Sequence, residues 1–274
     1  GTVVIEDVAT GHILVIADSN SKEPDNANPQ QVRAVQDTVE PGSVGKLITV
    51  GAALNQGTIT PTSVFQVPYS LNMPDAGGPS TDFHEHRGET LTATGVLAES
   101  SNTGTVLIGQ TMTDDQRYSM MRAFGFGQET GIELPGESAG LLRSSDDWQG
   151  RDRYVTMFGQ AYAITAVQEA SALATIANGG VRITPHIVKS WTNADGTVEV
   201  PERTQPVQVL EATTASQLLT MMESVVEDDL GTAAASKVPG YRVAVKTGTA
   251  ETIIDGLSGL VSTTAGIVPG DAPR

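Results

Sequence analysis

The chain has 274 residues, of which 39% are hydrophobic and 18% are charged, a composition typical of a globular protein. Lys and Arg number 16 against 32 Asp and Glu, so the net charge of −16 argues against nucleic acid or an anionic membrane surface as the partner. The absence of cysteine excludes disulfide bonds and thiol catalysis. Because no apolar run is long enough to cross a bilayer, we expect neither a membrane-spanning helix nor a signal peptide.

Apolar periodicity predicts strands near both ends of the chain and helices between them. In chain order we expect strands at 2–7 and 12–17, a polar connection at 18–42, a buried helix at 43–56, an irregular stretch at 57–88, helices at 91–100, 103–112, 114–124, 165–178 and 213–229, and strands at 240–249 and 261–268. This order predicts an α+β fold, with an antiparallel sheet built from both termini and a large helical insert. We expect one domain over 1–274, with its sheet part at about 1–20 and 181–274 and its helical part at about 43–180.

Ser43 and Lys46 form a Ser-x-x-Lys motif at the start of the buried helix. Residues three apart on a helix are neighbours, so the lysine amine can take the proton of the serine hydroxyl. The free N–H groups of a helix N-terminus favour a developing oxyanion. The spacing alone is weak evidence, because about one chance match is expected in a chain of this length. Ser19–Lys22 is such a match, in a polar loop, and Ser43 could also be a plain helix N-cap.

Two further polar groups can complete a serine acyl-transfer site. Ser100 and Asn102 lie at the break between two predicted helices, where the hydroxyl can relay a proton and the amide can orient the lysine and a substrate amide. A helix cap is the alternative for Ser100, and Ser70–Asn72 has the same spacing.

The predicted strand at 240–249 ends in Lys246, Thr247, Gly248 and Thr249. Here the lysine can bind an anion or tune a pKa, Thr247 can bond a carboxylate, and Gly248 lets a ligand approach the backbone. The N–H groups of Thr249 and Ser43 could form an oxyanion hole. The alternative is an edge lysine that discourages aggregation.

The three motifs together, in this order, resemble those of the penicillin-recognising serine acyltransferases. The finer similarity is to the transpeptidase domain of class B, monofunctional penicillin-binding proteins. It extends over nearly the whole chain and rests on Glu40–Lys46, Ser100–Asn102, Lys246–Ala250, Gly159–Gln168 and Ile176–Gly180.

The resemblance implies a D,D-transpeptidase that cross-links peptidoglycan stem peptides ending in D-Ala-D-Ala and is acylated by β-lactams. Ser43, Lys46, Ser100 and Asn102 would be catalytic, and Lys246, Thr247, Gly248 and Thr249 would bind substrate, with no metal or cofactor. Neutral Lys46 would be the general base, so its pKa must lie below the ordinary value, as burial and the nearby Lys246 charge would make it. The resemblance also implies an extracytoplasmic location at the bacterial cell membrane and a membrane-anchored parent protein within a cell-wall synthesis complex.

The sequence departs from the family pattern at several places. Val44 and Gly45 stand where the family usually has Thr and a bulkier residue, and Ala166 replaces a frequent proline. A glycine costs a helix up to about 1 kcal/mol against alanine, so Gly45 is expected to loosen the turn that holds Lys46. The chain also stops before the family's last strand and terminal helix. That strand lies centrally, so we expect the sheet to show unpaired edges unless another segment or chain supplies the strand, and a disrupted sheet is the other alternative.

Other functions remain open from the residues. A serine β-lactamase needs a base for deacylation, and the candidates Glu129, Glu133 and Glu137 lie in a Gly/Pro-rich stretch that favours a solvated loop. A non-catalytic β-lactam sensor is a second alternative. His84 and His86 lie on one side of an extended segment, but no third metal ligand is evident.

Overall fold

A computed structural model describes residues 1–19, 32–254 and 257–274, without the side chains of 251–258. The helices are α1 (Arg33–Gln36), η3 (Gly42–Gly45), α2 (Lys46–Asn55), α3 (Ala93–Ala98), α4 (Asn102–Gly109), α5 (Asp114–Ala123), η4 (Ser145–Asp147), α6 (Asp152–Val155), η5 (Thr156–Phe158), α7 (Ala166–Ala177), α8 (Ala212–Glu227) and η6 (Ala234–Ser236). The strands are β1 (Thr2–Glu6), β2 (Ile13–Asp18), β3 (Val64–Val67), β4 (Ser70–Leu71), β5 (Ser80–Thr81), β6 (Glu89–Thr92), β7 (Val181–Arg182), β8 (Trp191–Thr192), β9 (Val198–Glu199), β10 (Val207–Gln208), β11 (Ala244–Ile254) and β12 (Leu257–Ile267).

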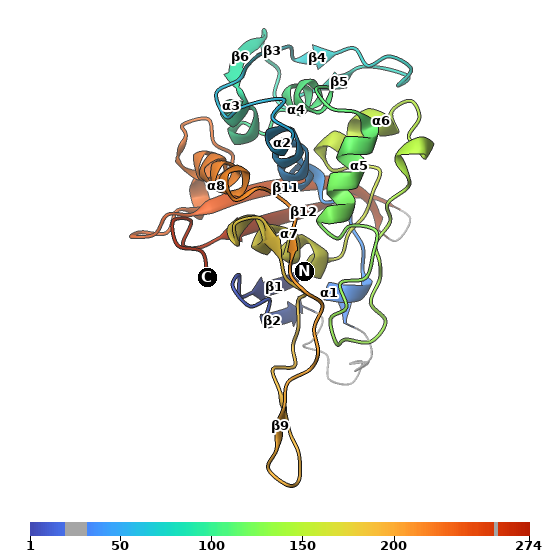
Figure 1. The fold of residues 1–274 in the computed structure, drawn as a ribbon. Helices are drawn as coiled ribbons and strands as arrows, with labels where there is room; N and C mark the ends of the chain where they lie inside the picture. Colours follow the sequence, from blue (N-terminus) through green and yellow to red (C-terminus); the bar gives the residue numbers. More distant parts are fainter. Residues whose placement is uncertain (20–31, 255–256) are drawn as a thin grey trace.

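The two ends of the chain form two antiparallel hairpins. β1 pairs with β2, and β11 pairs with β12 from Ala244↔Ile267 to Ile254↔Leu257. Helix α7 packs against both β1 and β12, and so ties the two hairpins together. Figure 1 shows β11 and β12 crossing the middle of the molecule, with α2 to α5 on one side and β1 and β2 on the other. Among the described strands, β1 pairs only with β2 and β12 only with β11, so the two hairpins are separate two-stranded sheets.

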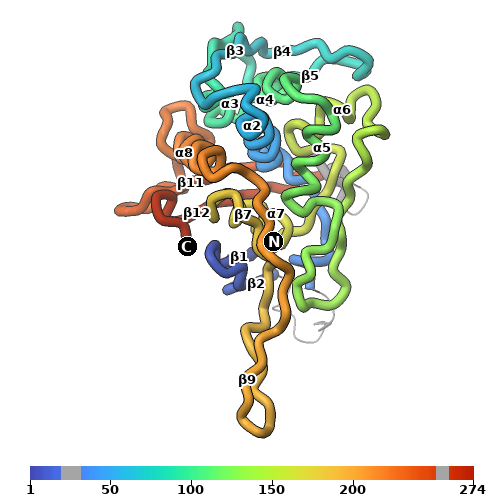
Figure 2. Tube along the Cα trace, in the orientation of Figure 1, coloured from blue at the N-terminus to red at the C-terminus, as the bar shows by residue number. Residues whose placement is uncertain are grey.

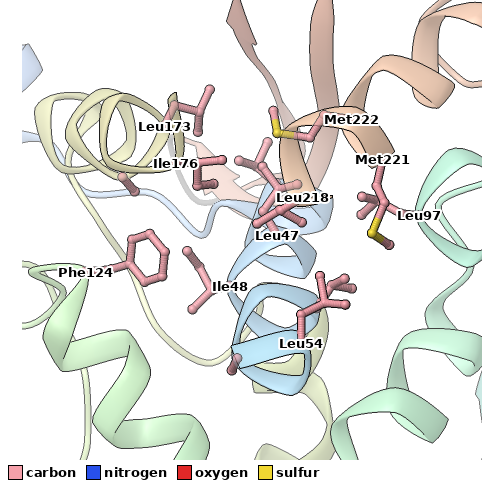
Figure 3. Packing of buried hydrophobic residues seen from close by; sticks show 14 of the residues in the cluster. Leu47, Ile48, Leu54, Leu97, Phe124, Leu173, Ile176, Leu218, Met221 and Met222 are labelled. Carbon is pink, nitrogen blue, oxygen red and sulfur yellow. The ribbon is translucent and has the colours of Figure 1, made fainter. Parts of the chain in front are cut away.

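Helix α2 is the centre of the helical core. Its residues from Lys46 to Leu54 are buried on every side, as in a helix that is packed all round. Helices α3, α4, α5 and α8 surround it. Figure 3 shows the packing of its Leu47, Ile48 and Leu54 among Leu97, Phe124, Leu173, Ile176, Leu218, Met221 and Met222. The start of α2 is therefore held by the core of the protein, which fixes the residues just before it.

The α+β fold class and the main helices agree with the sequence prediction. The capping box at Thr165 and Gln168 is present, and Ala166 follows the cap as the first residue of α7. The helix expected from residue 43 instead begins as the 3₁₀ turn η3 and becomes α-helical at Lys46. Such 3₁₀ turns are frequent at the N-termini of α-helices.

Several short elements were not predicted. The stretch 57–88, expected to be irregular, contains β3, β4 and β5, and the connection 18–42 contains α1. Their lengths of two to four residues are too short for a periodic pattern to show. A further ribbon around β8 and β9 projects away from the rest of the molecule, as Figure 2 shows.

No helix among the described residues is both long enough and apolar enough to span a membrane.

Candidate active site

Ser43 lies in the η3 turn, just before the buried helix α2. Its residue is partly exposed, whereas Gly42, Val44 and Lys46 around it are buried. The backbone of the turn is fixed from outside, because the Gly42 N–H donates to the carbonyl of Gly159 over 3.0 Å. Ser43 is therefore partly accessible, on a turn whose backbone is held by Gly159.

Two glycines bring strand β11 against this turn. A Cβ atom on Gly248 would lie 2.5 Å from the carbonyl oxygen of Pro41, and one on Gly42 would lie 2.6 Å from that of Thr249. Gly42 also has a φ of 55°, which favours glycine. Any side chain at either position would push the strand away from the turn. The two glycines thus place the backbone of Thr249 beside Ser43.

Lys46 and Lys246 both reach the hydroxyl of Ser100. The Nζ atom of Lys46 donates to Ser100 Oγ over 3.2 Å and also bonds the Ser100 carbonyl. Lys246 donates to the same Oγ over 2.8 Å. These three residues come from α2, the α3–α4 connection and β11, so the fold joins the three sequence motifs in one hydrogen-bonded chain. The Ser43 hydroxyl has no hydrogen-bond partner within the part of the protein that the structure describes.

The backbone at Ser100 has an unusual conformation. Its φ of 60° is left-handed and falls just after the end of α3, a place where glycine is usual. For a residue with a side chain, this conformation costs on the order of 1 kcal/mol. The next residue, Ser101, caps α4 by accepting from the Gly104 N–H over 2.8 Å. Hence Ser101 is the helix cap, and Ser100 is free to meet the two lysines.

The pKa values of both lysines are depressed. Burial, and then the charge of Lys246, hold the pKa of Lys46 well below its usual range, while the carboxylate of Asp82 acts in the opposite direction. Burial lowers the pKa of Lys246 to about 7. A neutral amine is therefore available near neutral pH to take a proton. An exposed lysine would be protonated at this pH and could not act as a base.

The other predicted residues lie around this centre with different contacts. Asn102 donates through Nδ2 to the carbonyl of Thr81 over 3.1 Å, and no hydrogen bond joins its amide to Lys46 among the described residues. The Thr247 hydroxyl lies 3.2 Å from that of Thr232. Thr249 is exposed, so its side chain is accessible to a ligand.

The geometry can be compared with known proteins. The family model "Penicillin binding protein transpeptidase domain" matches residues 1–274. This chain belongs to that family.

Similar proteins cover the whole of this domain. Penicillin-binding protein PbpB of Mycolicibacterium smegmatis is 37% identical over all of this chain and 44% of that protein, and peptidoglycan D,D-transpeptidase FtsI of Escherichia coli K12 is 32% identical over all of this chain and 45% of that protein. The crystal structure of penicillin-binding protein 3 from Mycobacterium tuberculosis, complexed with aztreonam, matches with a TM-score of 0.90 and 35% identity, over the whole chain and 64% of that structure. The chain thus spans less than half the length of these two curated relatives.

The remaining sequence candidates have other surroundings in this transpeptidase domain. Of Ser19–Lys22, only Ser19 lies within the described residues, where it accepts from the N-terminal amine. Ser70 lies in the short strand β4. Glu137 accepts from the N–H groups of Thr130 and Gly131, and Glu133 accepts from that of Ile187. These glutamates hold loops of the transpeptidase domain together.

Sequence reasoning did not single out Asp82, Glu40 or Tyr162 for the site. Glu40, three residues before Ser43, accepts from the Ala161 N–H over 2.8 Å. The hydroxyl of Tyr162 is buried beside Gly45. Tyr162 and Glu40, with Thr38, Arg143, Ala250 and Val261, also line a cavity of about 540 Å³ next to the turn. The only signal of such a role in the sequence was the position of Glu40 within the first motif.

Proposed function

We propose that this domain is a serine D,D-transpeptidase, in which Ser43 attacks the D-Ala-D-Ala carbonyl of a peptidoglycan stem peptide. The observation that carries this proposal is the convergence of Lys46 and Lys246 on the Ser100 hydroxyl beside an accessible Ser43. Three motifs of the family meet there in one site, with a base whose pKa is lowered. The curated relative FtsI is itself named a peptidoglycan D,D-transpeptidase.

The first chemical step forms an acyl-enzyme. The oxygen of Ser43 bonds to the carbonyl carbon while its proton passes to neutral Lys46, and the C–N bond to the terminal D-alanine then breaks. The leaving amine receives a proton from the Lys46–Ser100 chain. The backbone N–H groups of Ser43 and Thr249 stabilise the oxyanion, and one such donor is typically worth about 10²–10³ in rate. Lys246 and the threonines beside it bind the carboxylate of the substrate.

The second step transfers the acyl group. An amine of a neighbouring stem peptide gives up its proton to the Lys46–Ser100 chain and attacks the acyl carbon, which returns the Ser43 hydroxyl and forms the cross-link. A β-lactam follows the first step only: its ring opens on Ser43, and the leaving group stays attached, so the adduct persists. The cavity beside Glu40 provides room for the part of the donor peptide that precedes the scissile bond. The parent protein would work at the extracytoplasmic face of the membrane, within a cell-wall synthesis complex.

Acylation by a fluorescent penicillin tests the nucleophile. We expect the protein to take up one label, mapped to Ser43 by mass spectrometry, and Ser43→Ala to take up none. Ser19→Ala, the matched control from the other Ser-x-x-Lys motif, should label like the parent. Labelling of Ser43→Ala at the parental rate would overturn the assignment.

A second measurement separates the rival activities. Release of D-alanine from a stem pentapeptide, with formation of a cross-linked product, supports the transpeptidase. Rapid turnover of nitrocefin would instead indicate a β-lactamase. Stoichiometric acylation without any peptidase turnover of the parent protein would indicate a sensor.

A further inference from the structure

The carboxylate of Asp82 is a buried hydrogen-bonding centre at the end of strand β5. Asp82 is 9% exposed. Its Oδ1 accepts from the backbone N–H groups of Asn102 and Thr103, the latter over 3.0 Å. Its Oδ2 accepts from the hydroxyl of Ser101 over 2.8 Å and lies 3.0 Å from that of Thr103. One carboxylate thus binds three successive residues at the start of α4, where the free N–H groups and the helix dipole favour a negative charge.

His86 completes this centre and has a defined tautomer. The Gly88 N–H donates to Nδ1 of His86 over 3.2 Å, so the ring proton is on Nε2. Nε2 then donates to Oδ2 of Asp82 over 3.1 Å. The ring also meets Tyr69 edge-on, with centroids 5.8 Å apart. His86 is therefore a donor that orients the carboxylate.

The three residues held by Asp82 directly follow Ser100. Ser100 has the left-handed conformation that turns its hydroxyl and carbonyl toward Lys46 and Lys246. If the start of α4 moved, Ser100 would relax toward an ordinary conformation, and the chain between the lysines would open. The backbone N–H of Asp82 is itself bonded to the Tyr69 carbonyl over 3.0 Å, so the centre is anchored to the β4–β5 hairpin.

We propose that Asp82, oriented by His86, is a positioning residue for acyl transfer, which holds Ser100 between Lys46 and Lys246. The inference rests on the proposed function, because its readout is acylation of Ser43. Within the described part of the chain, Asp82 has no hydrogen bond to strand β11 or to Ser43. It acts on the reaction through its hydrogen bonds to the Ser101 hydroxyl and to the backbone N–H groups of Asn102 and Thr103, and through its charge. That charge raises the pKa of Lys46, against burial and Lys246, which lower it.

The test compares second-order acylation rates of a fluorescent penicillin across pH. For Asp82→Asn we expect a loss of about 10- to 100-fold, as for a catalytic group displaced by about 1 Å. The acid limb of the profile should also move to lower pH, because Lys46 loses the nearby negative charge while Lys246 stays. Thr113→Ala is the structural control, since it removes the N-cap of α5 outside the site. It should lower thermal stability and leave rate and pH profile unchanged.

A second pair of variants tests His86 without touching the carboxylate. Gln at position 86 keeps a donor for Asp82 and Ala does not, so His86→Ala should acylate several-fold more slowly than His86→Gln. If Asp82→Asn fails to fold, the acylation rates of these two His86 variants still test the positioning role of Asp82. Parental rate and an unshifted pH profile in Asp82→Asn, or equal rates in the two His86 variants, would overturn the inference. Failure of the parent to acylate at Ser43 would instead refute the proposed function.

Discussion

The Nζ atom of Lys246 lies 2.8 Å from the hydroxyl oxygen of Ser100, although the two residues are 146 positions apart in the chain. The amine of Lys46, from the Ser-x-x-Lys motif, donates to the same oxygen. Two basic groups that share one acceptor repel each other when both are charged, and burial makes that repulsion stronger. The site therefore favours a state in which at least one lysine is neutral, as proton abstraction from Ser43 requires.

This coupling predicts the effect of Lys246→Gln on the pH profile. The positive charge of Lys246 helps to lower the pKa of Lys46, so its removal should raise that pKa. Acylation by a penicillin needs neutral Lys46, and its acid limb should then move to higher pH, opposite to the shift expected for Asp82→Asn. Stopped-flow acylation rates between pH 5 and 9 measure the limb. A limb that stays in place, or moves to lower pH, would show that the two lysines are not coupled in this way.

Burial of Lys46 also predicts a conflict between stability and activity. An amine with a depressed folded pKa binds fewer protons than in the unfolded chain, so it lowers stability at pH values below its unfolded pKa of about 10.4. Lys46→Met fills a similar volume without a charge. We expect its free energy of unfolding at pH 7 to rise by about 1 kcal/mol or more, while labelling is lost.

Urea unfolding at pH 7 and pH 10 measures this difference. The gain should shrink toward pH 10, where the unfolded lysine also loses its proton. Lys237→Met is the matched control, because Lys237 is half exposed and pairs with Glu227 at the surface. Its effect should be small at both pH values. A Lys46→Met variant that is less stable than the Lys237→Met control at pH 7 would contradict the prediction.

The sequence predicted those parts of the fold that have long periodic patterns or clear caps. Helix α7, with Thr165 and Gln168 at its start, and helix α8 were expected within one or two residues of their observed bounds. The short strands β4 and β5 were not, because two residues carry no periodicity and their pairing depends on contacts made elsewhere. The last residues of β11 and the first residues of β12 were also missed, because the strands were expected at 240–249 and 261–268 whereas they span Ala244–Ile254 and Leu257–Ile267.

Within the candidate site, the sequence predicts the residues that carry motifs but provides no signal for the residues that contact them. The motifs predicted Ser43, Lys46, Ser100 and Lys246 together, and hydrogen bonds join Lys46 and Lys246 to Ser100 in the structure. Asp82 belongs to a segment without a readable pattern, and its role follows only from its contacts with Ser101 to Thr103. Gly45 was interpreted as a weak point of the helix. The structure shows a tightly packed position instead, because Tyr162 and Gly159 occupy the space of a side chain there.

The capping boxes at the starts of the described helices α5 and α7 provide a matched comparison of exposed and buried polar groups. Gln168 is 1% exposed, and its amide donates to the carbonyls of Gln128 and Ala139 over 2.9 Å each. Gln168→Ala leaves both carbonyls and the Thr165 N–H without their partner, so we expect a loss of about 2–4 kcal/mol. Gln116 occupies the same position in the exposed box at Thr113, and Gln116→Ala should cost less than about 1 kcal/mol. Chemical unfolding of both variants measures the difference, and equal losses would contradict the role of burial.

The last prediction concerns the contact between Gly45 and Tyr162 beneath the Ser43 turn. A Cβ atom at position 45 would lie 2.3 Å from the Tyr162 hydroxyl and 2.7 Å from the Cα of Gly159. Gly45→Ala should therefore cost about 1–3 kcal/mol and slow acylation, because the turn must shift. The Tyr162 hydroxyl is buried without a hydrogen-bond partner among the described residues, and burial raises its pKa. Tyr162→Phe should thus be neutral or stabilising.

A double-mutant cycle separates the contact from the general effect of adding a methyl group. Tyr162→Phe removes the nearest obstacle, so the Gly45→Ala loss should be smaller in the Tyr162→Phe background by about 0.5 kcal/mol or more. Gly78→Ala is the control, since a Cβ atom there meets no atom within 4 Å. Its cost should be small in both backgrounds. Strictly additive losses for Gly45→Ala and Tyr162→Phe would mean that the Gly159 backbone, rather than the hydroxyl, requires glycine before Lys46.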